Sequence, residues 1–88
     1  MEKQHLGNIV ILVTNRQVNS EKVNKILSEN GHLIMTRLGV NIEPRCISSC
    51  TGLITIVVKG GLKQINDLTK KLNKLYGIVA KNIIITKK

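Results

Sequence analysis

The chain has 88 residues and a net charge of +9, and Tyr76 is its single aromatic residue because Trp and Phe are absent. Residues 1–88 fit one domain and leave no room for a second, and the core must be built from Ile, Leu and Val. No apolar run approaches the roughly 18–20 residues that cross a bilayer, which excludes a membrane-spanning protein.

The first residues, MEKQHLGN, do not place an apolar segment behind a basic one. We therefore expect no signal peptide and a cytoplasmic protein. We expect residues 1–5 to form a flexible tail. In the cytoplasm the two cysteines are expected to be reduced thiols.

Residues 7–15, GNIVILVTN, are apolar and rich in β-branched side chains, which predicts a strand. Residues 19–31 predict a helix that begins at Asn19 or Ser20, because either side chain can accept a hydrogen bond from a free amide of the first turn. Gly31 is expected to end this helix in the left-handed conformation. The apolar stripe of the helix consists of Val23, Ile26 and Leu27.

Three further strands and a second helix follow along the chain. Residues 32–40 and 51–61 predict the second and third strands, and residues 78–88 predict the fourth. Residues 62–77 predict the second helix, which Gly77 caps. The apolar stripe of this helix consists of Leu62, Ile65, Leu68, Leu72 and Leu75.

The order β-α-β-β-α-β predicts an α+β protein of the ferredoxin-like class, with one four-stranded antiparallel sheet and both helices on one face. Residues 9–13 and 54–58 do not alternate between apolar and polar side chains, as a sheet with one face in water would. The face opposite the helices should therefore be an apolar patch, which monomeric proteins rarely expose. We expect another copy of the chain to cover it, in a homodimer or a homotetramer.

Residues 59–88 hold eight lysines and one acid, a charge of +7. We interpret these lysines first as a solubilising surface. The alternative is an acidic partner such as nucleic acid. The strands lack the aromatic side chains with which an RRM stacks bases, so only non-specific contact is left. We expect such binding to be weak and to vanish at physiological salt.

The segment 37–50, RLGVNIEPRCISSC, is the best candidate for contact with a small ligand or a protein. Two guanidinium groups near a tight turn can hold a carboxylate or a phosphate. The alternative is ordinary surface ion pairing, for instance with Glu43. The candidate ligand-binding residues are Arg37, Gly39, Arg45, Cys46 and Cys50.

The spacing Cys46-x3-Cys50 raises the question of a metal or redox site. Structural zinc prefers a two-residue spacing and needs four ligands, and the body of the fold adds only His32. We therefore predict no cofactor and free thiols. The alternatives are a redox sensor, and a zinc ion or an iron–sulfur cluster held by four thiols at a dimer axis.

The residues do not indicate an enzyme. Paired carboxylates are missing, and nothing in the sequence places a cysteine beside His32. Gly60 and Gly61 before a helix are too short for a phosphate-binding loop, and they more simply turn the strand into the helix. We predict a protein that acts by binding.

Three stretches carry a resemblance to a known family. They are NIVILVTNR at 8–16, ENGHLIMTRLGV at 29–40 and KLNKLYGIVAKNIIITKK at 71–88. With the order of elements over residues 6–87, they resemble the iron-only hydrogenase system regulators. That family is similar to the ligand-binding C-terminal domain of the nickel-responsive repressor and, more loosely, to ACT domains.

The resemblance implies a cytoplasmic regulatory domain that self-associates through its sheet, without a preceding ribbon-helix-helix. It does not carry over a nickel site, because the histidine cluster of the repressor has no counterpart beyond His32, and Cys50 falls earlier than the family's cysteine. The pair Cys46 and Cys50 departs from the loop usual in the regulators. TNRQVNS also lacks the Pro-Gly turn of amino-acid-binding ACT domains.

Overall fold

A computed structural model describes residues 3–42, 45–47 and 50–86. The elements are β1 (His5–Val13), α1 (Arg16–Glu29), a 3₁₀ turn η1 (Gly31–Leu33), β2 (Ile34–Asn41), β3 (Gly52–Gly60), α2 (Leu62–Asn73) and β4 (Ile78–Ile84). This order is the predicted one.

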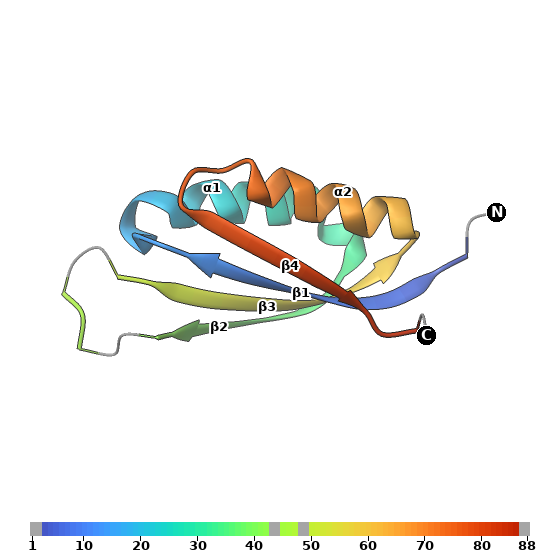
Figure 1. The fold of residues 1–88 in the computed structure, drawn as a ribbon, viewed down its shortest axis with the longest axis horizontal. Helices are drawn as coiled ribbons and strands as arrows, with labels where there is room; N and C mark the ends of the chain where they lie inside the picture. Colours follow the sequence, from blue (N-terminus) through green and yellow to red (C-terminus); the bar gives the residue numbers. More distant parts are fainter. Residues whose placement is uncertain (1–2, 43–44, 48–49, 87–88) are drawn as a thin grey trace.

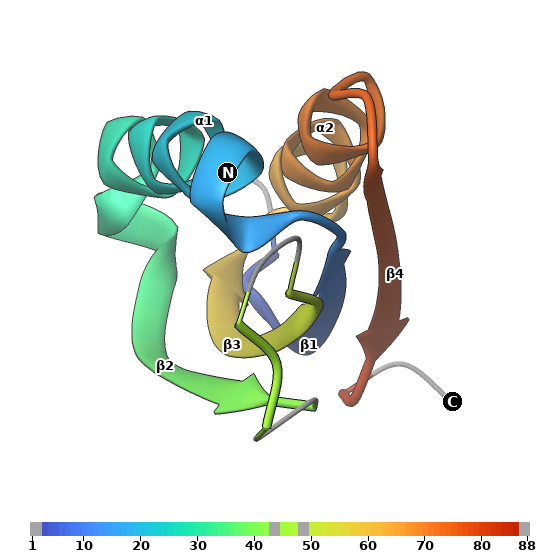
Figure 2. The same cartoon turned by 90° about the vertical axis from the view of Figure 1, so that its left-hand side faces the viewer.

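The four strands form a single antiparallel sheet in the order β2-β3-β1-β4. Both helices lie on one face of this sheet, and β2 and β4 form its two edges (Figures 1 and 2). The predicted ferredoxin-like arrangement is confirmed. Within the described residues, neither helix is long and apolar enough to cross a membrane.

The core lies between the helices and the sheet. Ile9, Ile11 and Val13 alternate along β1 toward the helices, since successive side chains of a strand point to opposite faces. The apolar stripes of both helices pack against these strand residues. The helical side chains repeat every 3.6 residues and the strand side chains every 2, and both sets lie in one apolar layer. The other core residues are Val23, Leu27, Leu33, Ile56, Val58, Ile65, Leu68, Leu72, Ile78 and Ala80.

The first helix begins about one turn earlier than the sequence predicts. It starts at Arg16, preceded by Asn15 in the left-handed conformation with φ 49°. Asn19 is therefore not a cap. It is buried inside the helix, and its Nδ2 donates a hydrogen bond to the carbonyl of Thr14 over 2.6 Å. Gly31 does not take the expected left-handed conformation either, because the chain continues directly into η1.

Gly77 takes the expected left-handed conformation, but it does not cap α2, which ends four residues earlier at Asn73. Gly77 has φ 79°, and a Cβ there would lie 2.6 Å from Oγ1 of Thr14. The side chain of Asn73 at the end of α2 then forms two hydrogen bonds with the edge strand β4. Its Nδ2 donates to the carbonyl of Ala80 over 2.8 Å, and its Oδ1 accepts from the amide of Ala80 over 2.7 Å. Side-chain hydrogen bonds thus satisfy part of the open edge of β4.

The amino-terminal strand begins and ends two residues earlier than the predicted range of 7–15. His5, the last residue of the expected tail, already belongs to β1. The amide of Leu6 donates to Oγ1 of Thr86 over 3.1 Å, which holds the two ends of the chain together. Residues 1–2 of the predicted tail lie outside the described residues.

The face opposite the helices is apolar at one end of the sheet. Leu12 lies between Leu53 of β3 and Val79 of β4, and Leu53 lies beside Val40 of β2. These four side chains form one row across all four strands, which we call the Leu12 row. Val40 and Val79 are about half exposed, at 49% and 47%. The predicted apolar patch is therefore present at this end of the sheet.

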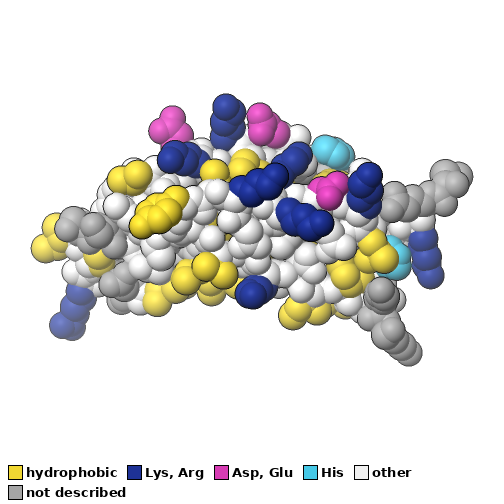
Figure 3. All heavy atoms as spheres, turned by 45° about the horizontal axis from the view of Figure 1, so that its top comes forward, with side chains coloured by type: hydrophobic (Ala, Val, Ile, Leu, Met, Phe, Trp, Pro, Cys, Tyr) yellow, Lys and Arg dark blue, Asp and Glu magenta, His cyan; other side chains and the backbone are white. Residues whose placement is uncertain are grey.

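The rest of that face is mixed, which the sequence interpretation missed. Val10 lies between Thr55 and Lys81, so a lysine stands on the face that was expected to be free of them. Asn8 in the next row donates a hydrogen bond to Oγ1 of Thr55 over 2.8 Å. Most other lysines do lie on the helical side, where Figure 3 shows basic side chains gathered above a border of hydrophobic ones.

Candidate functional site

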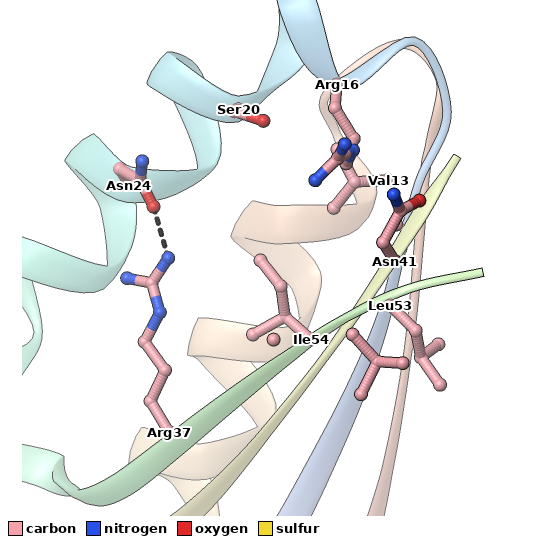
Figure 4. Close-up of a pocket in the computed structure, with 11 residues that line it drawn as sticks. Val13, Arg16, Ser20, Asn24, Arg37, Asn41, Leu53 and Ile54 are labelled. Atoms are coloured by element: carbon pink, nitrogen blue, oxygen red, sulfur yellow. Dashed lines mark hydrogen bonds between the residues drawn. The ribbon is translucent and has the colours of Figure 1, made fainter. Parts of the chain in front are cut away.

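An open cavity of about 360 Å³ lies between α1 and the edge strand β2 (Figure 4). It exists because β2, at the edge of the sheet, is almost entirely exposed while the core lies over the central strands. The cavity lining combines apolar strand residues with five polar side chains, two of which are positively charged. The polar side chains are Arg16, Ser20, Asn24, Arg37 and Asn41.

Arg37 reaches the cavity from β2. It is paired in register with Ile56, whose side chain is in the core, so the arginine points to the helical side of the sheet. Its Nη2 donates a hydrogen bond to Oδ1 of Asn24 over 2.5 Å. This bond connects β2 to α1 across the cavity and holds the guanidinium group in place.

Arg16 reaches the cavity from the first position of α1 (Figure 4). Its main-chain amide donates to the carbonyl of Cys50 over 2.7 Å, which fixes the start of the helix against the chain before β3. Its side chain crosses Gly52, where a Cβ would collide with Cδ of the arginine and lie 3.2 Å from Cγ. Among the residues that the structure describes, its buried Nε has no hydrogen-bond partner.

The remaining cavity wall is small or apolar. A Cβ added at Gly39 would meet no atom within 4 Å, so the glycine leaves open space beside Arg37. Val13 and Ile54 contribute apolar surface from the central strands. The arrangement can hold a small molecule that has an anionic group at one end and an apolar body at the other.

The structure brings together two of the five candidate ligand-binding residues, Arg37 and Gly39. Arg45, Cys46 and Cys50 do not line the cavity. Glu43, the suggested ion-pair partner, lies outside the described residues. The sequence interpretation missed Arg16 because the helix was started one turn late, which left this arginine in a loop.

The two cysteines are not free thiols, contrary to the prediction. They form a disulfide, Cys46–Cys50, with 5.7 Å between the Cα atoms. This Cα separation lies within the usual range for a disulfide. Cys50 is buried, and its amide donates to Oε1 of Gln17 over 3.2 Å.

The third candidate metal ligand, His32, lies apart from Cys46 and Cys50. His32 lies in η1, at the far end of α1 from Cys50, which contacts the first helical residue. A helix of 14 residues spans about 21 Å. Within the described residues, no three side chains of His, Cys, Asp or Glu gather to hold a metal ion.

Thiol titration tests the disulfide. Protein purified without reductant and then unfolded should expose no reactive thiol, and two after reduction. Reduced protein should be less stable by about 2 kcal/mol, because a cross-link over a short loop constrains the unfolded chain. The Cys46→Ser variant should match reduced wild-type protein. Disulfides are rare in cytosolic proteins, so this result is informative. Two reactive thiols in protein purified without reductant would contradict the disulfide.

The order of elements and the strand order define a small domain with the ferredoxin-like fold. The model of the TM1266-like family, described as "Iron-only hydrogenase system regulator, putative", matches residues 5–82. The chain therefore belongs to this family, which confirms the resemblance found in the sequence. Among curated proteins, none matches the chain closely enough to report as a relative.

Solved structures agree on the fold. Protein TM1266 from Thermotoga maritima is 21% identical with a TM-score of 0.84, over 96% of this chain and 100% of that one. The ACT domain of GTP pyrophosphokinase from Chlorobium tepidum is 13% identical with a TM-score of 0.67, over 97% and 90%. CPII, a nitrogen regulatory PII-like protein from Thiomonas intermedia K12, is 10% identical with a TM-score of 0.55, over 99% and 94%.

Proposed function

We propose that the protein is a homo-oligomeric regulatory domain that acts in the cytoplasm by binding a small ligand or a partner protein and does not catalyse a reaction. The family description links it to the regulation of an iron-only hydrogenase system. The regulatory PII-like relative was solved with ADP, AMP and bicarbonate bound, which supports a small-ligand role for this fold.

The observation that carries the proposal is the Leu12 row. It places four adjacent apolar side chains on the open face of the sheet, across every strand. Covering each half-exposed side chain contributes roughly 1 kcal/mol. A second copy brings the same row by symmetry, and a two-fold pair is the commonest way to close such a surface.

Self-association through this face leaves the helical side free. The polar side chains of the cavity lie between α1 and β2 on the helical side, although Val40 and Leu53 of the Leu12 row also belong to its lining. Ligand binding there can change the position of the edge strand β2, whose residues also contribute to the Leu12 row. This gives a physical route from the ligand to the dimer interface.

Analytical ultracentrifugation at low micromolar concentration tests the proposal. We expect a species of twice the 9.8 kDa chain mass, since the apolar row should be covered at this concentration. A tetramer through the open edges of β2 or β4 would also agree with a homo-oligomer. A well-folded monomer under these conditions would contradict the proposal.

A further inference from the structure

We propose that the cavity between α1 and β2 binds a small molecule through an oxyanion, a carboxylate or a phosphate group, held by Arg16 and Arg37. The inference rests on the proposed regulatory function and deepens it, since it names the class of ligand and the groups that hold it.

The cavity lining is positively charged. Two guanidinium groups enter one cavity from opposite elements, and none of its described lining residues is acidic. Arg16 and Arg37 both remain charged at any physiological pH. Two fixed cations beside a low-dielectric wall attract an anion more strongly than the same charges in water. An oxyanion bound in the cavity would offset this positive charge.

Arg16 also presents a hydrogen-bond donor that lacks a partner among the described residues. The Nε of Arg16 is buried, yet it has no acceptor among the described residues. Buried donors are nearly always satisfied, so such a group calls for a partner that the described residues do not supply. The Nε–H and one terminal N–H of a guanidinium group form a fork that matches two oxygens of a carboxylate or a phosphate.

Both arginines are held in position by neighbouring residues. Asn24 accepts from Nη2 of Arg37, which fixes that guanidinium group from the helix side. Gly52 provides the space over which Arg16 lies, because any larger residue would displace its Cδ and Cγ atoms. A pre-positioned pair loses little side-chain entropy when the anion binds.

The shape of the cavity limits the ligand. About 360 Å³ lies near the lower end of the range for small-molecule sites. The space at Gly39 and the apolar surface of Val13 and Ile54 suit a small body behind the oxyanion. The ligand should therefore be a small carboxylate or phosphate ester and not a polymer.

Nuclear magnetic resonance on ¹⁵N-labelled protein provides a direct test, because the Nε–H groups of arginine give their own signals. Inorganic phosphate and acetate serve as separate probes at constant ionic strength. We expect the Nε–H signals of Arg16 and Arg37 to shift and saturate on the order of millimolar probe. The probe that saturates at lower concentration identifies the preferred oxyanion.

Variants locate the binding. Arg16→Met and Arg37→Met should each weaken it about tenfold or more, the loss expected for one charge-assisted contact. Gly39→Val keeps both charges and the strand, and it should weaken binding by filling the cavity. Lys63→Met, an exposed residue of α2, removes the same charge elsewhere and should leave binding unchanged.

Signals that shift without saturation, or saturation that survives in Arg16→Met and Arg37→Met, would overturn the proposal. Spectra of each variant show whether it is folded, and Gly39→Val tests the site even if one arginine variant unfolds. The sedimentation result does not depend on this outcome. A dimer that binds neither probe would refute the anion site alone, and a monomer that binds phosphate would refute the oligomer alone.

Discussion

Leu12→Asp should convert the proposed dimer into a folded monomer. The Leu12 side chain is central in the row that crosses all four strands, with Leu53 and Val79 as its direct neighbours. An aspartate there would have to be buried in the interface without a partner, and this costs several kcal/mol. A penalty of about 4 kcal/mol raises the dissociation constant about a thousandfold.

Sedimentation and circular dichroism together check this expectation. Val18→Asp is a matched control, because Val18 is 57% exposed on α1 and lies away from the sheet face. It adds the same charge and should leave the dimer intact. A Leu12→Asp protein that remains a dimer would show that the copies associate through another surface.

Ile11→Ala should remove a large part of the stability. Ile11 is fully buried on the central strand β1, between Ile54 of β3 and Ala80 of β4. Removing its outer carbons loses burial and leaves a cavity, at a cost of about 2–5 kcal/mol. A domain of this size has a free energy of unfolding of roughly 4–13 kcal/mol, so the variant should unfold at a much lower urea concentration.

Urea unfolding followed by circular dichroism measures this effect, since the chain has no tryptophan to report by fluorescence. The protein concentration must be the same for all variants, because association contributes to apparent stability. Ile47→Ala is the control. Its side chain is 94% exposed, and its loss should change stability by less than about 0.5 kcal/mol. Equal midpoints for the two variants would contradict the core described here.

Part of the candidate site was predictable and part was not. Arg37 and Gly39 stood out because they share a polar, glycine-containing segment in an otherwise aliphatic chain. Arg16 did not stand out, because its role depends on Gly52, which lies 36 positions later in the sequence and leaves room for its side chain. The only local signal was a basic residue near the start of a helix, and this signal is common on surfaces.

The sequence by itself determined the order of elements, the apolar helical stripes as far as Leu72 and the left-handed conformation of Gly77, but not the end of α2 at Asn73. These features depend on local periods and on backbone conformations that neighbouring residues fix. It also determined that both faces of the sheet are partly apolar, because consecutive apolar residues in a strand must point to opposite sides.

Only the tertiary structure decided the features that depend on register and on distant contacts. The position of Lys81 beside Val10 follows from how β4 pairs with β1. The disulfide pairs Cys46 with Cys50, and Cys50 is also hydrogen-bonded to the start of α1, a contact between distant parts of the sequence. The cavity itself exists because α1 and the edge strand β2 do not pack closely, and no local pattern encodes the distance between two elements.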